Sequence, residues 1–267
     1  MYSTIDADDF GFECHANGST NWNVVNILDG TEVTTGDAVF LVKKVNSEFN
    51  IDNSTVKSTE TGVLVQIIDN DDDYVGVDVS GDTWGLDNAL YGHTVDSHMP
   101  TFNESFSEED GYSSSFAADT SASKSDSYDT SDNWECNVNL TNGTYEGDLW
   151  NSSGYVGSNA ATTMTVTIGD GTNSATLTGI ISAGEFKHTK KSFSVGDGDW
   201  SNADYLGHVT NQKNWNGVNN VNVVIKSGAT WNITGNGIIT GFTNDGSISG
   251  GTVTENSDGT WTIAVTN

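Results

Sequence analysis

A short sequence repeat, called the repeated phrase below, recurs along the chain and limits the folds that the chain can adopt. Each copy joins an alternating apolar run to Asn, Asp or Gly turn residues, continues with Thr-x-Val or Thr-x-aromatic, and ends near a Gly. The copies lie at residues 26–33, 50–56, 138–147, 166–179 and 223–235. A repeat of roughly 20 to 30 residues with one or two short strands is typical of coils that stack on one continuous core. We therefore predict an all-β fold, a parallel β-helix (β-solenoid).

Five apolar runs are the predicted strands: Val24–Ile27, Val39–Val42, Gly62–Ile67, Met164–Ile168 and Val221–Ile225. Alternate residues of each run would face the core, while the outward Thr, Asn and Ser stay in solvent. Asn in the turns tolerates left-handed backbone angles and can stack as an amide ladder. Turn signals at this spacing also suit a β-sandwich, which stays open as an alternative.

We predict one β-solenoid domain over residues 1–267. Two stretches depart from the repeated phrase. Residues 100–135 are rich in Ser and Asp, and residues 184–220 combine Lys with Trp and Tyr. Both are predicted to be long loop excursions from the solenoid, which is where binding surfaces often lie.

The charge of the chain argues against several classes of partner. Asp and Glu number 37 against 9 basic residues, all of them Lys, and the net charge is −28. Nucleic-acid binding requires a cationic surface that replaces phosphate counterions, so no nucleic-acid partner is expected. Anionic membrane surfaces would also repel the chain. Direct membrane insertion is not expected, because no run of about 18 apolar residues is present.

Two segments, residues 137–149 (NVNLTNGTYEGDL) and 223–243 (VVIKSGATWNITGNGIITGFT), carry a resemblance to a known class of proteins. The sequence resembles right-handed parallel β-helix cell-surface proteins of bacteria or archaea, with adhesin-like or autotransporter-passenger-type repeats. The resemblance implies an extracellular or cell-surface location. It also implies adhesion or structural reach as the role, and a host or environmental glycan or protein surface as the partner. We therefore predict a non-enzymatic surface module.

A carbohydrate-active β-helix enzyme is the alternative function. Polysaccharide lyases of the fold resemble one another in using Ca²⁺ with an Arg or Lys base, and this chain has no Arg. Hydrolases need paired carboxylates, for which the Asp69–Asp73 run is the candidate. A third interpretation, an ice- or mineral-binding solenoid, predicts long Thr-x-Thr ladders, of which only fragments such as Thr165–Thr167 occur.

Clustered acids predict calcium as a possible cofactor, because hard cations bind several carboxylate and carbonyl oxygens. The candidate ligands are Asp69, Asp71, Asp72, Asp73, Asp197 and Asp199. A solvated acidic loop is the alternative for each cluster.

Aromatic residues in polar surroundings predict a glycan-binding surface, because sugars stack on aromatic rings. The candidates are Trp84, Tyr91, Tyr112 and Tyr128. The alternative is that these rings hold a loop against the solenoid. Cys14 and Cys136 form the only cysteine pair of the sequence, which predicts either a disulfide or two buried thiols.

Overall fold

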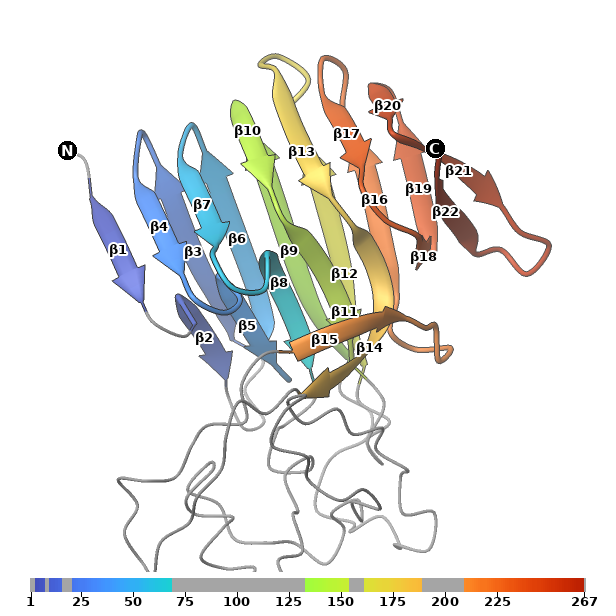
Figure 1. The fold of residues 1–267 in the computed structure, drawn as a ribbon, viewed down its shortest axis with the longest axis horizontal. Helices are drawn as coiled ribbons and strands as arrows, with labels where there is room; N and C mark the ends of the chain where they lie inside the picture. Colours follow the sequence, from blue (N-terminus) through green and yellow to red (C-terminus); the bar gives the residue numbers. More distant parts are fainter. Residues whose placement is uncertain are drawn as a thin grey trace, which may run out of the picture.

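The computed structural model describes residues 3–7, 10–15, 21–68, 133–153, 161–188 and 209–266 (Figure 1). Within these ranges every regular element is a β-strand and no helix occurs. Most strand pairs are parallel, and antiparallel pairs occur only at β15 and near the C-terminal end. The predictions of an all-β chain and of parallel sheets are therefore confirmed.

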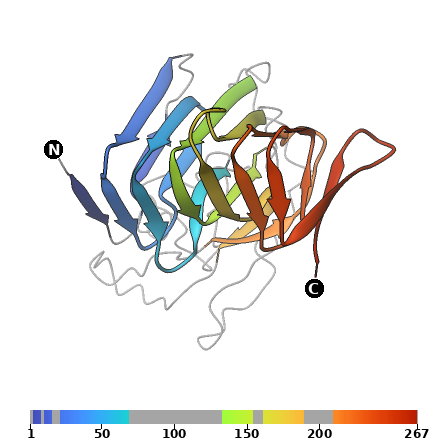
Figure 2. The same ribbon diagram turned by 90° about the horizontal axis from the view of Figure 1, so that it is seen from above.

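The strands form three rows, and consecutive strands in the chain belong to different rows as far as β14. Row 1 joins the sheets β1-β4-β7 and β10-β13-β17-β20, because β7 lies against β10. Row 2 is the sheet β2-β5-β8-β11-β14-β15, and row 3 is the sheet β3-β6-β9-β12-β16-β19. Each strand thus pairs with the next strand of its own row, except that β7 and β10 lie side by side and belong to separate sheets. Seen from above, the rows run around a common interior (Figure 2).

The strand bounds are as follows. Row 1 contains β1 Thr4–Ala7, β4 Glu32–Thr35, β7 Thr55–Ser58, β10 Gly143–Glu146, β13 Ala175–Gly179, β17 Thr230–Ile233 and β20 Ser247–Ser249. Row 2 contains β2 Phe12–His15, β5 Phe40–Lys43, β8 Val63–Ile68, β11 Asp148–Ser152, β14 Ile181–His188 and β15 Val209–Lys213. Row 3 contains β3 Trp22–Leu28, β6 Asn46–Asp52, β9 Asn133–Thr141, β12 Ala161–Ile168, β16 Val221–Ile225 and β19 Gly241–Asn244. All five predicted runs correspond to strands of rows 2 and 3, although Val39 and Gly62 each lie one residue before the strand begins.

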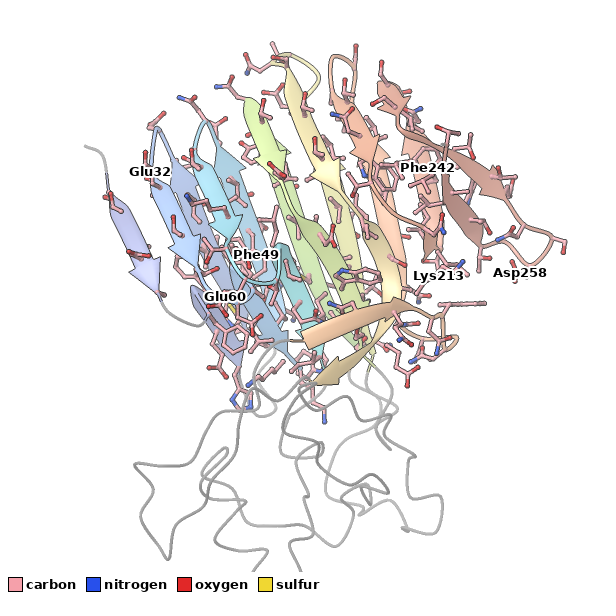
Figure 3. The ribbon with its side chains drawn as sticks, in the orientation of Figure 1. Glu32, Phe49, Glu60, Lys213, Phe242 and Asp258 are labelled. Carbon is pink, nitrogen blue, oxygen red and sulfur yellow. The ribbon has the colours of Figure 1, made fainter. Side chains whose placement is uncertain are left out.

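The interior is built by alternation along the strands. In row 3, Val138, Val166 and Val223 occupy one register position and are fully buried. The rings of Phe12, Phe40 and Phe49 continue the interior, with centroids 5.3 Å apart for the first pair and 4.1 Å for the second. In Figure 3, Phe49 lies between the strands, whereas the exposed Glu32 and Asp258 lie on the outside.

The corner between rows 3 and 1 repeats one backbone conformation. Asp29, Asn53 and Asn142 each follow a row 3 strand and have positive φ angles of 52°, 45° and 49°. Asp and Asn adopt this left-handed conformation more readily than other non-glycine residues. The predicted left-handed turn asparagines are therefore present. The amide ladder, in contrast, lies on the outer face of row 3 and not at the corner.

An antiparallel sheet closes the C-terminal end. It consists of β18 Gly237–Ile239, β21 Gly251–Glu255 and β22 Trp261–Val265, in the order β18-β22-β21. Ile263 of β22 is buried, and the ring of Trp261 lies 5.5 Å from that of Phe242.

Most of both predicted excursions lies outside the described residues, so the single-domain prediction stays a prediction. The described parts are the strand ends around residues 133–135 and the segments 184–188 and 209–220. No helix in the described ranges is long and apolar enough to cross a membrane.

Candidate functional site

A hollow of about 450 Å³ lies on the outer face of row 3, where β9, β12 and β16 are neighbours. Its strand side is formed by the buried Trp134 and by outward-facing residues of β9, β12 and β16, and its other side by the segment that leads into β16. The strand residues are Asn133, Trp134, Glu135, Thr163, Thr165 and Asn222, and the segment contributes Gly217, Val218 and Asn220.

Strand alternation explains why polar groups line the hollow. Trp134 and Cys136 are buried on β9, so Glu135 between them faces outward and is exposed. Glu135 is the register partner of Thr163, and Thr165 is the partner of Asn222. Adjacent strands lie about 4.8 Å apart, which brings the side chains of register partners within reach of one ligand.

The segment that forms the second side is a turn held by Asn216. The side-chain Oδ1 of Asn216 accepts hydrogen bonds from the backbone N–H groups of Val218 and Asn219, both at 3.0 Å. Gly217 has a φ of +93°, a conformation that favours glycine. The turn therefore follows from local Asn and Gly chemistry.

A buried amide network anchors this turn to the interior. Asn219 is fully buried, and its Nδ2 donates to the carbonyls of Asn214 at 3.0 Å and of Asn151 and Gly184 at 3.2 Å. Asn151, also fully buried, donates to the carbonyls of Thr162 at 2.6 Å and Asn220 at 2.8 Å. Satisfied buried networks of this kind make a local structure rigid. The hollow is therefore a preformed feature of the surface.

The lining offers amides and hydroxyls together with one carboxylate, that of Glu135. No hydrogen bond joins the side chains of Glu135, Thr163, Thr165 or Asn222 to another residue in the described ranges. The indole N–H groups of Trp134 and Trp215 are buried and also have no hydrogen-bond partner among the described residues. These groups can bind a ligand rich in hydroxyl groups, and none of the described lining residues has a cationic side chain to bind an anion.

Outside the hollow, the outer face of row 3 carries an asparagine ladder. Asn139 donates to Asn50 at 2.8 Å, and Asn50 donates to Asn26 at 2.9 Å. These three residues are register partners on β9, β6 and β3. Their amides are engaged with one another, in contrast to the amide of Asn222 in the hollow.

The predicted metal ligands Asp69, Asp71, Asp72, Asp73, Asp197 and Asp199 lie outside the described residues, as do the predicted ligand-binding residues Trp84, Tyr91, Tyr112 and Tyr128. Both predictions stay predictions. Over the described ranges, no group of three or more His, Cys, Asp or Glu residues is arranged to hold a metal ion.

Cys14 and Cys136 are free and buried, so of the two predicted alternatives the structure has the buried thiols and not the disulfide. Cys14 lies on β2, the edge strand of row 2, and Cys136 lies on β9, the third strand from the same end of row 3. Two strand spacings amount to about 10 Å, and a disulfide requires Cα atoms within about 7 Å. Ser47 of β6 is the register partner of Cys136, and its side chain contacts the thiol of Cys14. The pKa of each thiol is raised, chiefly by burial.

Sequence reasoning missed the residues of the hollow. Asn133–Glu135 and Gly217–Asn220 were placed in the predicted excursions, at the points where these rejoin the strands. The Asn-rich segment 214–220 (NWNGVNN) contained a turn signal, but nothing in it indicated that the turn lies beside β9.

No protein-family model matches the chain, and comparisons with curated proteins and with solved structures also find no match. Interpretation of the hollow therefore depends on the chain's own residues.

Proposed function

We propose that the chain is a non-enzymatic module of the cell surface or extracellular space, adhesin-like or structural, built as a right-handed parallel β-helix. The observation that carries the proposal is the strand order. As far as β14, consecutive strands change row, and within each sheet of the three rows the strands of successive turns pair in parallel, with the antiparallel β15 as the exception. A chain that winds through three rows in this way makes coils that bury their inward residues on each other.

The surface chemistry supports a role outside the cell and away from anionic polymers. The outward positions of row 3 are mainly Asn, Thr, Asp and Glu, and the net charge is −28. A partner would be a glycan or protein surface of the host or environment. Calcium bound at the clustered aspartates remains a possible cofactor under this proposal.

The alternative, a carbohydrate-active enzyme, finds less support at the hollow. Hydrolysis of glycosidic bonds uses two carboxyl groups about 5 to 9.5 Å apart, one on each side of the scissile bond. Among the described residues, Glu135 is the only carboxylate that lines the hollow. A single carboxylate can hold a sugar hydroxyl but cannot supply both the acid and the base or nucleophile.

The test compares binding with turnover on the intact chain. The purified protein is applied to arrays of glycans and of extracellular proteins, and separately incubated with a panel of polysaccharides with and without calcium. Binding without release of reducing ends or unsaturated products is the expected result. Turnover of any polymer would overturn the proposal and favour the enzyme.

A further inference from the structure

We propose that the hollow on row 3 binds a neutral sugar residue of a glycan. This inference deepens the proposed function and rests on it. It concerns a site formed by Glu135, Thr165, Asn222 and their neighbours, and not the aromatic residues outside the described ranges.

The hydrogen-bonding groups of the lining match a polyhydroxyl ligand. A sugar hydroxyl both donates and accepts, as do the hydroxyls of Thr163 and Thr165 and the amide of Asn222. The Glu135 carboxylate accepts only, and hydrogen bonds to a charged group are the stronger kind. Two adjacent sugar hydroxyls can donate to its two oxygens.

The charge of the site selects against acidic sugars. No described residue of its lining is Lys, Arg or His, so the carboxylate of a uronate or sialate would have no ionic partner among them. Glu135 would repel such a group at close range, and the net charge of −28 would slow its approach. A cation has too few ligands, because calcium requires six to eight oxygens, commonly from several carboxylates.

Size and rigidity agree with one or two sugar rings. Sites for small molecules typically enclose about 300 to 1,000 Å³, and the hollow has about 450 Å³. The three strands and the Asn219–Asn151 network hold the lining in place before binding, which reduces the entropy cost of ordering it. Val218, which is 37% exposed, offers an apolar surface to the C–H groups of a ring.

The experiment fills the hollow with a large side chain. Only one of its hydrogen-bonding groups, a hydroxyl, is lost. Thr165→Trp places a large side chain in the hollow. The matched control is Thr167→Trp, because Thr167 lies on the same strand and the same face, two residues farther along and outside the lining. A second pair is Glu135→Gln with Glu146→Gln, an exposed glutamate of row 1. Circular dichroism and melting temperature show whether each variant is folded.

All variants are measured against arrays of neutral hexose and N-acetylhexosamine glycans and of uronate- and sialate-bearing glycans. Binding to a neutral glycan is expected, with loss of binding in Thr165→Trp and a reduction of about tenfold in Glu135→Gln. Both controls should bind as the parent does.

Equal binding by Thr165→Trp and Thr167→Trp, binding to acidic glycans alone, or no glycan binding would each overturn this inference. The outcomes for the two proposals are separable. Turnover of a polysaccharide would overturn the non-enzymatic function but leave the sugar site supported if Thr165→Trp abolishes binding. Absence of both glycan binding and turnover removes the sugar site alone.

Discussion

The inner and outer faces of row 3 are made from the same strands and differ in burial and in the chemistry of their side chains. On the inner face, Val138, Val166 and Val223 are in register and fully buried. On the outer face, Glu135 and Thr165 lie on β9 and β12, and their side chains have no hydrogen-bond partner in the described ranges. Alternation along one strand thus places the residues that stabilise the fold on the inner face and the residues of the proposed binding site on the outer face. Substitutions on the inner face should change unfolding and leave binding intact, and those in the hollow should do the reverse.

The largest effect on this comparison is expected from truncation of an inner residue. Leu140 of β9 is fully buried, and Leu140→Ala should lower the free energy of unfolding by about 3 kcal/mol, because apolar contacts are lost and a cavity remains. Asn137→Ala on the outer face of the same strand should change it by less than about 0.5 kcal/mol. Urea unfolding followed by circular dichroism measures both. Equal losses would contradict the division between the faces.

A smaller effect is expected for the buried hydroxyl of Tyr145. It donates to the carbonyl of Ile51 at 3.0 Å, and the carbonyl of Thr141 is a second acceptor. Tyr145→Phe should cost about 1 kcal/mol, since two buried carbonyls lose this donor.

Titration provides a second readout for Tyr145. Burial, then the nearby charge of Asp52, raises the pKa of Tyr145 to about 12, and the backbone of Asn53 lowers it in part. The folded state therefore holds this proton more tightly than the unfolded state. Its contribution is full below about pH 10 and is lost as the pH rises through about 12. Ultraviolet titration should show a late tyrosinate that Tyr145→Phe removes. Its persistence in the variant would contradict the assignment.

Ser47 breaks the pattern of an apolar inner face. Its Oγ is buried without a hydrogen bond of good geometry, and the neighbouring thiol of Cys14 is a weak partner. Ser47→Ala should be neutral or raise stability by up to about 1 kcal/mol. The control is Ser182→Ala, because the hydroxyl of Ser182 donates to Ala183 at 2.6 Å and accepts from Ile238 at 3.0 Å. That variant should lose stability. A loss of equal size in both would show that Ser47 has an effective partner.

The smallest effect is expected at the corner between rows 1 and 2. Burial raises the pKa of Asp148, and hydrogen bonds from the Ile180 N–H and from Trp150 lower it in part. Asp148→Asn keeps an oxygen for the Ile180 N–H and removes the buried charge, so it should stabilise the fold slightly at neutral pH.

The sign of the pH dependence at Asp148 is set by the raised pKa. The folded state binds this proton more tightly, so the stability that it contributes is present below the ordinary value of 3.8 and is lost as the pH rises through the folded pKa. The advantage of Asp148→Asn should therefore be absent below pH 3.8 and grow above it. Thermal melts of both proteins across this range measure the difference. A difference in melting temperature between the two proteins that increases toward low pH would contradict the assignment.

Much of the fold was predictable because its signals are local. Alternating runs such as Met164–Ile168 are strands, and the turn asparagines Asn53 and Asn142 adopt left-handed angles. The outer asparagine ladder was not placed correctly, because an amide ladder requires register between strands and register is a non-local property. For the same reason the sequence left open whether Cys14 and Cys136 form a disulfide or remain two buried thiols, because the choice depends on how many strands separate them.

The sequence by itself determined the alternation, the turn chemistry and the acidic surface, because each depends on residues within a few positions of one another. Only the tertiary structure decided that Glu135, Thr165 and Asn222 share one hollow. Each comes from a different strand, and parallel pairing brought them together across long separations in the chain. The turn at Gly217 completes the hollow because buried Asn219 and Asn151 fix it against the strands. Such contacts are long-range hydrogen bonds, and no local pattern in the chain specifies them.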